Sequence, residues 1–124
     1  MRYMMLIHSQ ETAEPLSPED DLNARLAHRS VIEEATAKGV LVGAEPLAPT
    51  RSAITLRMRN GAPMVTDGPF AETKEQLAGY YITDCKHLDE AKQWAARIPT
   101  YCFGDGGCIE IRPRPGLASR AGNA

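Results

Sequence analysis

The chain has 124 residues, 14 lysines and arginines against 16 acidic residues, a net charge of −2 at pH 7, and 43% hydrophobic residues. That length accommodates one hydrophobic core, and the composition is typical of an ordinary globular domain. The chain has no basic run of the kind that nucleic-acid binders carry, and no apolar run near the roughly 20 residues of a membrane helix. We therefore expect one cytoplasmic domain that binds neither nucleic acid nor membrane.

Strand and helix signals alternate in the first part of the chain. The compact apolar run within Arg2–His8 predicts a strand that is covered on both faces. Ser17, followed by a proline and acidic residues, is a favoured N-cap and predicts the start of a helix. The helix should run to about Lys38 and end at Gly39, because glycine readily adopts the left-handed conformation beyond a helix. Val40–Ala44 reads as the second strand.

A hairpin follows in the sequence. Ile54–Arg59 alternates apolar and polar residues with the period of a strand that has one wet face. Asn60-Gly61 is the favoured dipeptide of a type I′ turn, so Pro63–Val65 should fold back along this strand. The proline places the returning segment at an edge.

The second half repeats the alternation. Leu77–Ile82 is apolar on both faces and predicts a central strand, and Leu88–Ile98 carries apolar residues at helical spacing before Pro99. Cys108–Arg112 predicts the last strand. We expect a domain over residues 1–113 and a disordered tail over residues 114–124.

The order of these elements is β-α-β-β-α-β with an added hairpin, which predicts an α+β fold of the ferredoxin-like type with both helices on one sheet face. The other sheet face would then expose apolar residues to water. A second copy is the simplest cover, because a two-fold axis lets one apolar surface bury itself. We therefore expect a homodimer in which the two sheets form a dimeric α+β barrel.

One stretch resembles a known family. The segment Asp67-Gly68-Pro69-Phe70 and the residues that follow it, AETKEQLAGYY, resemble the hallmark of the YCII-related proteins, in particular their DGPF subgroup. The similarity extends over about residues 2–113. The resemblance implies a ferredoxin-like dimer related in shape to muconolactone isomerases, with a histidine and an aspartate in a cleft.

The resemblance leaves two functions open. Some YCII-type relatives are dehydrochlorinases that act on chlorinated hydroxyquinols, which implies a cofactor-free lyase or isomerase acting on a small oxygenated substrate. Many DGPF members are encoded beside extracytoplasmic-function sigma factors, which implies a ligand-binding or regulatory module without catalysis. A fold alone does not decide between these functions.

His28 and Asp67 are the predicted catalytic residues. His28 lies on the apolar side of its helix, since Ala24 precedes it by four residues and Val31 follows it by three. An imidazole held by a carboxylate can move protons near neutral pH. The alternatives are that His28 is a hydrogen-bonded core residue and that Asp67 only forms the turn before Gly68.

Further polar and aromatic residues are predicted to bind the substrate, although each has a structural alternative. Arginines would hold an anionic or phenolate oxygen unless they are merely solvated. Tyr80 and Tyr81 point to opposite sheet faces, so one of them can reach the cleft. The predicted substrate-binding residues are His8, Arg25, Arg57, Phe70 and Tyr81, with Arg29 as a further arginine. The structural alternative for Phe70 is a core or interface anchor.

We expect neither a metal nor a cofactor. The three histidines, His8, His28 and His87, form no pair at helical spacing, and the three cysteines have no C-x-x-C spacing. The cysteines, Cys85, Cys102 and Cys108, should therefore be reduced thiols. The glycine-rich segment 104–107 lacks the lysine and helix start of a phosphate loop.

Overall fold

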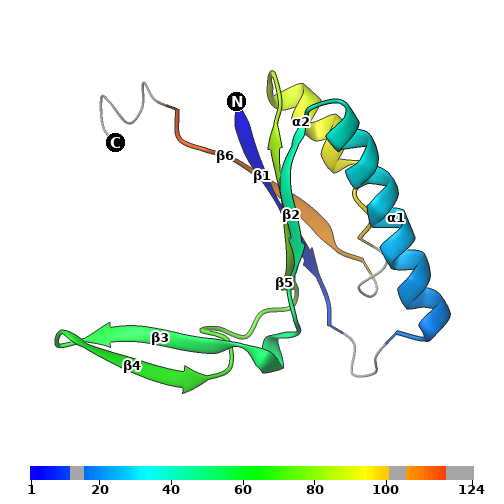
Figure 1. Ribbon diagram of the computed structural model, residues 1–124. Helices are drawn as coiled ribbons and strands as arrows, with labels where there is room; N and C mark the ends of the chain where they lie inside the picture. Colours follow the sequence, from blue (N-terminus) through cyan, green and yellow to red (C-terminus); the bar gives the residue numbers. More distant parts are fainter. Residues whose placement is uncertain (12–15, 101–105, 117–124) are drawn as a thin grey trace.

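The computed structural model describes residues 1–11, 16–100 and 106–116. A four-stranded antiparallel sheet with the strand order β2-β5-β1-β6 forms its body, and a separate two-stranded sheet joins β3 to β4 (Figure 1). In chain order the elements are β1 (Arg2–Ser9), α1 (Pro18–Ala37), β2 (Leu41–Pro46), a 3₁₀ turn (Thr50–Ser52), β3 (Ile54–Arg59), β4 (Ala62–Asp67), β5 (Gln76–Asp84), α2 (Leu88–Ala95) and β6 (Cys108–Pro113).

The predicted α+β class, with antiparallel sheets and two helices, is confirmed. β5 lies between β1 and β2 and is antiparallel to both, so the two β-α-β units interleave as the split arrangement requires. β6 then pairs with the free side of β1. This order places the middles of β1 and β5, the two most apolar strands, at the centre of the sheet.

Both helices cover the same face of the sheet (Figure 1). The alternation along β1 turns Tyr3, Met5 and Ile7 toward the helices, where all three are buried. They form one core cluster with buried residues of the helices and of β5, among them Val31, Ala35, Tyr81, Ala91, Trp94 and Ala95. A single hydrophobic core therefore lies between the helices and the sheet.

The helix ends follow local chemistry. The Oγ atom of Ser17 accepts a hydrogen bond from the backbone N–H of Asp20 at 3.1 Å, and Gly39 adopts φ +72° just beyond α1, as the sequence predicted. α2 ends at Ala95, earlier than the predicted Ile98. The N–H of Ile98 still bonds to Ala95 O, but a residue that precedes a proline disfavours helical geometry, so only a tight turn continues.

The opposite face of the sheet is open. The pairing of Leu6 with Tyr80 and of Met4 with Ile82 places these four side chains on one face, and no described helix packs on that face. Met4 and Leu77 are exposed there, and Leu6 is half-buried. The prediction that β1 and β5 are covered on both faces is therefore met on one face only within the single chain.

The hairpin β3–β4, which we call the arm, projects away from the main sheet on its open side (Figure 1). Its turn has positive φ at both Asn60 (+53°) and Gly61 (+78°), as a type I′ turn requires. Every residue of β4 is exposed. The returning strand was predicted as Pro63–Val65, and it is longer and pairs only with β3.

The ends of the described chain add two points. The predicted domain boundary at residue 113 coincides with the end of β6, and most of the predicted tail, residues 117–124, lies outside the described residues. Neither α1 nor α2, the helices of the described chain, is long and apolar enough to cross a membrane.

Candidate functional site

A cavity of about 590 Å³ lies between α1 and the β2-β5-β1 part of the sheet. Its walls are mostly apolar. Its polar lining comes from α1, which contributes Asp21, Arg25, His28 and Arg29, and from the sheet, which contributes Glu45 and Tyr81. The apolar lining consists of Ile7, Leu16, Ala24, Ile32, Ala44, Pro46 and Ala78. A mostly apolar cavity with a few converging polar groups is the usual form of a small-molecule site.

His28 and Tyr81 form the polar centre of this cavity. The Nδ1 atom of His28 and the hydroxyl of Tyr81 are 2.7 Å apart, a short hydrogen bond in which either group can be the donor. The rings lie 6.0 Å apart and are tilted by 42°. Tyr81 is only 4% exposed, so its hydroxyl is fixed by packing as well as by this bond. The imidazole is therefore held in one orientation.

Burial lowers the pKa of His28 below its ordinary value, because a charged imidazolium loses hydration inside the protein. At neutral pH the ring is consequently uncharged and keeps a nitrogen lone pair. A neutral imidazole beside a phenol is suited to accepting a proton and returning it.

The local sequence explains why these two side chains meet. His28 shares its helix face with the buried residues Ala24, Val31 and Ala35, which are four, three and seven residues away. Tyr81 faces the helices because β5 alternates, which sends Tyr80 to the open sheet face. The sequence predicted opposite directions for the two tyrosines, and the tertiary structure assigns Tyr81 to the cavity.

Gly79 shapes the wall of the cavity next to Tyr81. A Cβ atom at this position would lie 2.9 Å from the backbone oxygen of Glu45 and 3.3 Å from Cα of Pro46. Only glycine lets β2 approach β5 this closely, so the missing side chain permits the local strand geometry that forms the cavity.

The two arginines lie at the cavity rim and are largely exposed. Arg25 forms an ion pair with Asp21 at 3.0 Å, and Arg29 forms one with Glu33 at 3.2 Å, each one helical turn away. Exposed pairs of this kind contribute little to stability and exchange partners readily. The guanidinium groups are therefore available to an anionic or phenolate oxygen at the rim.

The remaining predicted site residues lie elsewhere in the single chain. His8 is on the open sheet face, where its Nε2 atom is 3.2 Å from a carboxylate oxygen of Glu110. Arg57 and Asp67 are on the arm, and Phe70 follows it; none of the four lines the cavity. The chain thus brings together His28, Tyr81, Arg25 and Arg29, and by itself does not bring Asp67 to His28.

The single chain narrows two of the sequence interpretations. Phe70 is 77% exposed and so is not a core anchor of its own chain, because it lies past the arm rather than on a packed element. The hydrogen-bond partner of His28 seen in the structure is the phenol of Tyr81, which the sequence indicated only as a possible cleft residue. The register of β5 against β1, rather than any motif, reveals that partner.

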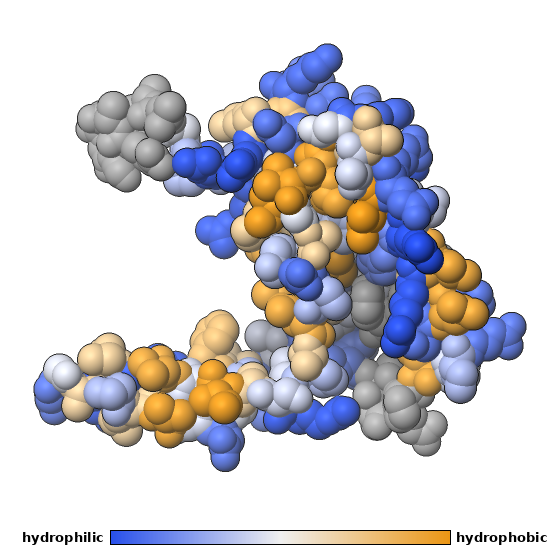
Figure 2. Space-filling model, in the orientation of Figure 1, coloured by the Kyte–Doolittle hydropathy of each residue, from blue (hydrophilic) through white to orange (hydrophobic). Residues whose placement is uncertain are grey.

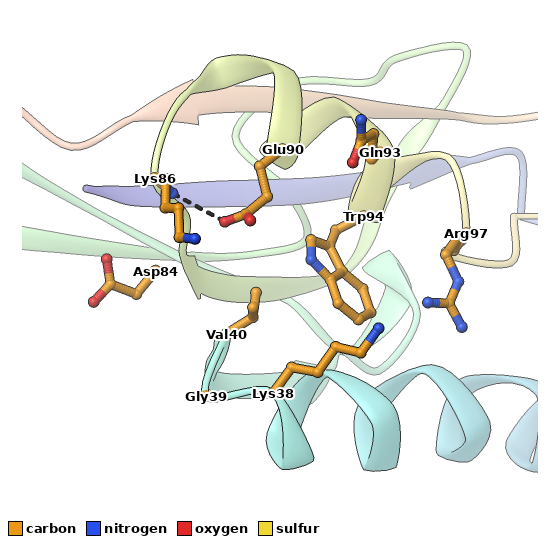
Figure 3. A pocket seen from close by; sticks show the side chains of 9 residues that line it. All are labelled: Lys38, Gly39, Val40, Asp84, Lys86, Glu90, Gln93, Trp94 and Arg97. Atoms are coloured by element: carbon orange, nitrogen blue, oxygen red, sulfur yellow. Dashed lines mark hydrogen bonds between the residues drawn. The ribbon is translucent and has the colours of Figure 1, made fainter.

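A second, polar cleft of about 460 Å³ lies where α2 meets the C-terminal end of α1 (Figure 3). Lys38 and Arg97 flank the ring of Trp94, at 5.7 and 4.8 Å from its centroid, and both side chains also contact Glu34. The bond to Arg97 lowers the pKa of Glu34 and raises that of Arg97. These compensated charges tie the two helices together.

Neither a metal site nor a disulfide appears in the part of the chain that the structure describes. No group of three or more His, Cys, Asp or Glu side chains is placed to hold a metal ion there. Cys85 is buried and Cys108 is exposed, both are free thiols, and burial raises the pKa of each. Cys102 lies outside the described residues.

The chain is similar to known proteins both in its sequence and in its fold. Residues 1–113 match the YCII-related domain family. An uncharacterized protein from Rhizobium meliloti is 38% identical over 114 residues, which cover 91% of either chain. The structure of 5-chloro-2-hydroxyhydroquinone dehydrochlorinase from Burkholderia phenoliruptrix, in complex with 2,5-dihydroxybenzoquinone, aligns at a TM-score of 0.47 with 17% identity, covering 95% of this chain and 98% of that chain.

Proposed function

Because the chain belongs to the YCII-related domain family and its cavity joins a neutral imidazole to a phenol, we propose that it is a cofactor-independent acid–base enzyme. The reaction class is that of a lyase or isomerase, including dehydrochlorination, on a small oxygenated substrate. The observation that carries this proposal is the 2.7 Å bond between His28 and Tyr81 inside a mostly apolar cavity.

His28 is the general base in this proposal. Its lowered pKa keeps it unprotonated at neutral pH, so it can take a proton from a C–H or O–H group of the substrate. Tyr81 fixes the orientation of the ring, and the general-base role requires the tautomer in which the Nδ1–H of His28 donates to the hydroxyl oxygen of Tyr81. In a dehydrochlorination, the electron pair left by that proton forms the new double bond and chloride leaves, so no external oxidant or reductant is needed.

The arginines of the rim take the developing negative charge. An enolate or phenolate oxygen at the rim would meet Arg25 or Arg29, and either can exchange its present carboxylate partner for the substrate. The apolar walls then hold the carbon skeleton and exclude water from the base. A small, ring-sized substrate with ionisable hydroxyl groups fits this distribution of polar and apolar lining.

Asp67 keeps the catalytic role predicted for it only if a second copy supplies it, because it does not line the cavity of its own chain. Tyr81 occupies the position of partner to His28. An Asp67→Asn variant tests whether Tyr81 or Asp67 is the partner of His28. Unchanged turnover would leave Tyr81 as the partner. A loss of turnover as large as that of a His28 variant would assign the role to Asp67.

We also propose that the protein is a homodimer formed through the open sheet faces. Apolar side chains of β1 and β5 occupy the open face, which suits self-association.

The test compares His28→Asn and Tyr81→Phe with a control, His87→Asn, at the N-cap of α2 outside the cavity. Small substituted hydroxyquinols serve as probes, with chloride release and solvent deuterium exchange as the measurements. We expect a loss of roughly 10²–10⁴ in kcat for His28→Asn, a smaller loss for Tyr81→Phe, and no change in chemistry for the control. Full turnover by a folded His28→Asn protein would refute the proposal, and tight binding without any turnover would favour the regulatory alternative.

A further inference from the structure

The two faces of the arm differ sharply. Pairing places Ile54, Leu56 and Met58 on the same face as Pro63 and Val65, since Leu56 lies opposite Val65 and Met58 opposite Pro63. The other face carries Thr55, Arg57, Arg59, Ala62, Met64 and Thr66. Leu56 is 58% exposed and Val65 is 62% exposed, so the apolar face is uncovered in the single chain.

An uncovered arm of this kind needs a partner surface. A two-stranded ribbon is at best marginally stable in water unless its apolar face packs on something. The hydrogen bonds from Gly68 N to Ala53 O and from Thr55 Oγ1 to Gly68 O, both 2.7 Å, join the two chain segments at the base of the arm to each other and leave its apolar face uncovered. Figure 2 shows hydrophobic residues both on the arm and on the adjoining sheet, on two sides of one concave region.

A matching surface lies on the open sheet face. A trough of about 360 Å³ is formed at the end where β1 begins and β6 ends, with Met4, Leu6 and Ile82 as its apolar lining. Three arginines, Arg2, Arg112 and Arg114, rim it. Among the residues that the structure describes, Arg112 and Arg114 have no ion-pair partner, unlike the paired arginines of α1, whereas the charge of Arg2 acts on Asp84.

We propose that the arm of each copy lies with its apolar face in the arginine-rimmed trough of a second copy. Asp67 supports this choice of partner surface, because it pairs with Ile54 and so places a carboxylate on the apolar face of the arm. The trough offers apolar lining and unpaired cations, and the arm offers apolar side chains and an anion. The arrangement rests on the homodimer proposed above and adds a second contact to it.

The geometry of a two-fold dimer is compatible with this contact. The arm leaves the body near the end where β5 begins, and the trough lies at the other end of the sheet (Figure 1). When the two open faces pack together about a two-fold axis that lies between the sheets and perpendicular to the strands, the strands of the second copy run in the reverse direction. Each arm then lies at the trough end of the other copy. Packed sheets lie about 10 Å apart, and a six-residue strand spans about 20 Å, so the arm is long enough to cross the second sheet.

The first test measures the dimer dissociation constant by sedimentation equilibrium. Leu56→Asp changes the apolar face of the arm, and Met64→Asp is the matched control on its other face. We expect Leu56→Asp and Arg112→Glu each to raise the dissociation constant roughly 100-fold, because each change occurs twice in the dimer. Met64→Asp should raise it less than about 5-fold. Equal effects of Leu56→Asp and Met64→Asp, or none from either, would overturn the inference.

A second test identifies the surface that the arm contacts. Met58 is replaced by p-benzoylphenylalanine, and chains of natural and heavy isotope composition are mixed before irradiation, so that crosslinks between copies are recognised by mass. Crosslinks between copies to residues 2–6 or 112–114 support the docking site. Crosslinks confined to one chain, or reaching residues 16–29 of the second copy, overturn it.

Different results would refute the homodimer, the arm contact and the acid–base assignment. A wild-type protein that stays monomeric at high concentration would remove the homodimer and the arm contact together. A wild-type dimer whose dissociation constant ignores Leu56→Asp would remove the arm contact alone. Neither result touches the acid–base assignment, which depends on the turnover of His28→Asn.

Discussion

Replacing Gly79 by alanine should destabilise the protein, because the added methyl group would clash with backbone atoms of β2, which cannot move aside as a flexible side chain could. The new methyl group would lie 2.9 Å from Glu45 O and 3.3 Å from Cα of Pro46. An ordinary carbon–oxygen contact is several tenths of an ångström longer, so β2 and β5 must separate locally. Overpacking of this kind costs about 1–3 kcal/mol, which exceeds the gain of about 0.4–1 kcal/mol that alanine brings by restricting the unfolded chain.

The assay is thermal and urea unfolding followed by circular dichroism, with Gly43→Ala as the matched control. Gly43 lies in β2, has an ordinary φ, and would place its methyl group in open space, so only the effect on the unfolded chain remains. Relative to the Gly43→Ala control, which has the same effect on the unfolded chain, a midpoint lower by roughly 4–12 °C is expected for Gly79→Ala. Little or no loss is expected for Gly43→Ala itself. A Gly79→Ala protein as stable as its Gly43→Ala control would refute the reasoning that close approach of β2 and β5 requires glycine.

Two further predictions concern α1. Ser17→Ala removes the bond from Asp20 N to Ser17 Oγ and should cost about 0.5–2 kcal/mol of unfolding free energy by urea titration; Ser30→Ala, at an exposed position of the same helix, should cost clearly less. Because burial lowers the pKa of His28, the unfolded state binds more protons than the folded state below the ordinary histidine pKa, so stability should fall as the pH decreases through that range. His28→Asn should flatten this dependence relative to wild type, and identical slopes in pH-resolved urea titrations would contradict the assignment.

Signals within single elements predicted most of the fold. The capping serine, the glycine beyond α1 and the Asn60-Gly61 turn each set a local geometry, so their elements appear close to where the sequence places them. The sequence pattern predicted the end of α2 at Ile98 instead of Ala95, because the apolar spacing continues to Ile98. In the structure Ile98 packs in the core although the helix has already ended. A buried side chain does not require that its backbone be helical.

The candidate site was only partly predictable, because its contacts join residues that are far apart in the sequence. Helical spacing placed His28 on an apolar face, which the structure confirms. The pairing of His28 with Asp67 relied on a motif rather than on distance, and in the single chain Asp67, the last residue of β4, does not line the cavity. The hydrogen bond to Tyr81 joins residues 53 positions apart and depends on strand register, which no local pattern encodes.

The amino-acid sequence by itself determined the class of the fold, the family and the presence of a histidine on a buried helix face, because each depends on local periodicity, turn chemistry or a contiguous motif. Only the tertiary structure decided that Tyr81 rather than Tyr80 enters the cavity, that β3 and β4 leave the sheet as an arm, and that one sheet face stays open. These features depend on which strands pair and in what register, and pairing is settled by packing energies summed over distant parts of the chain.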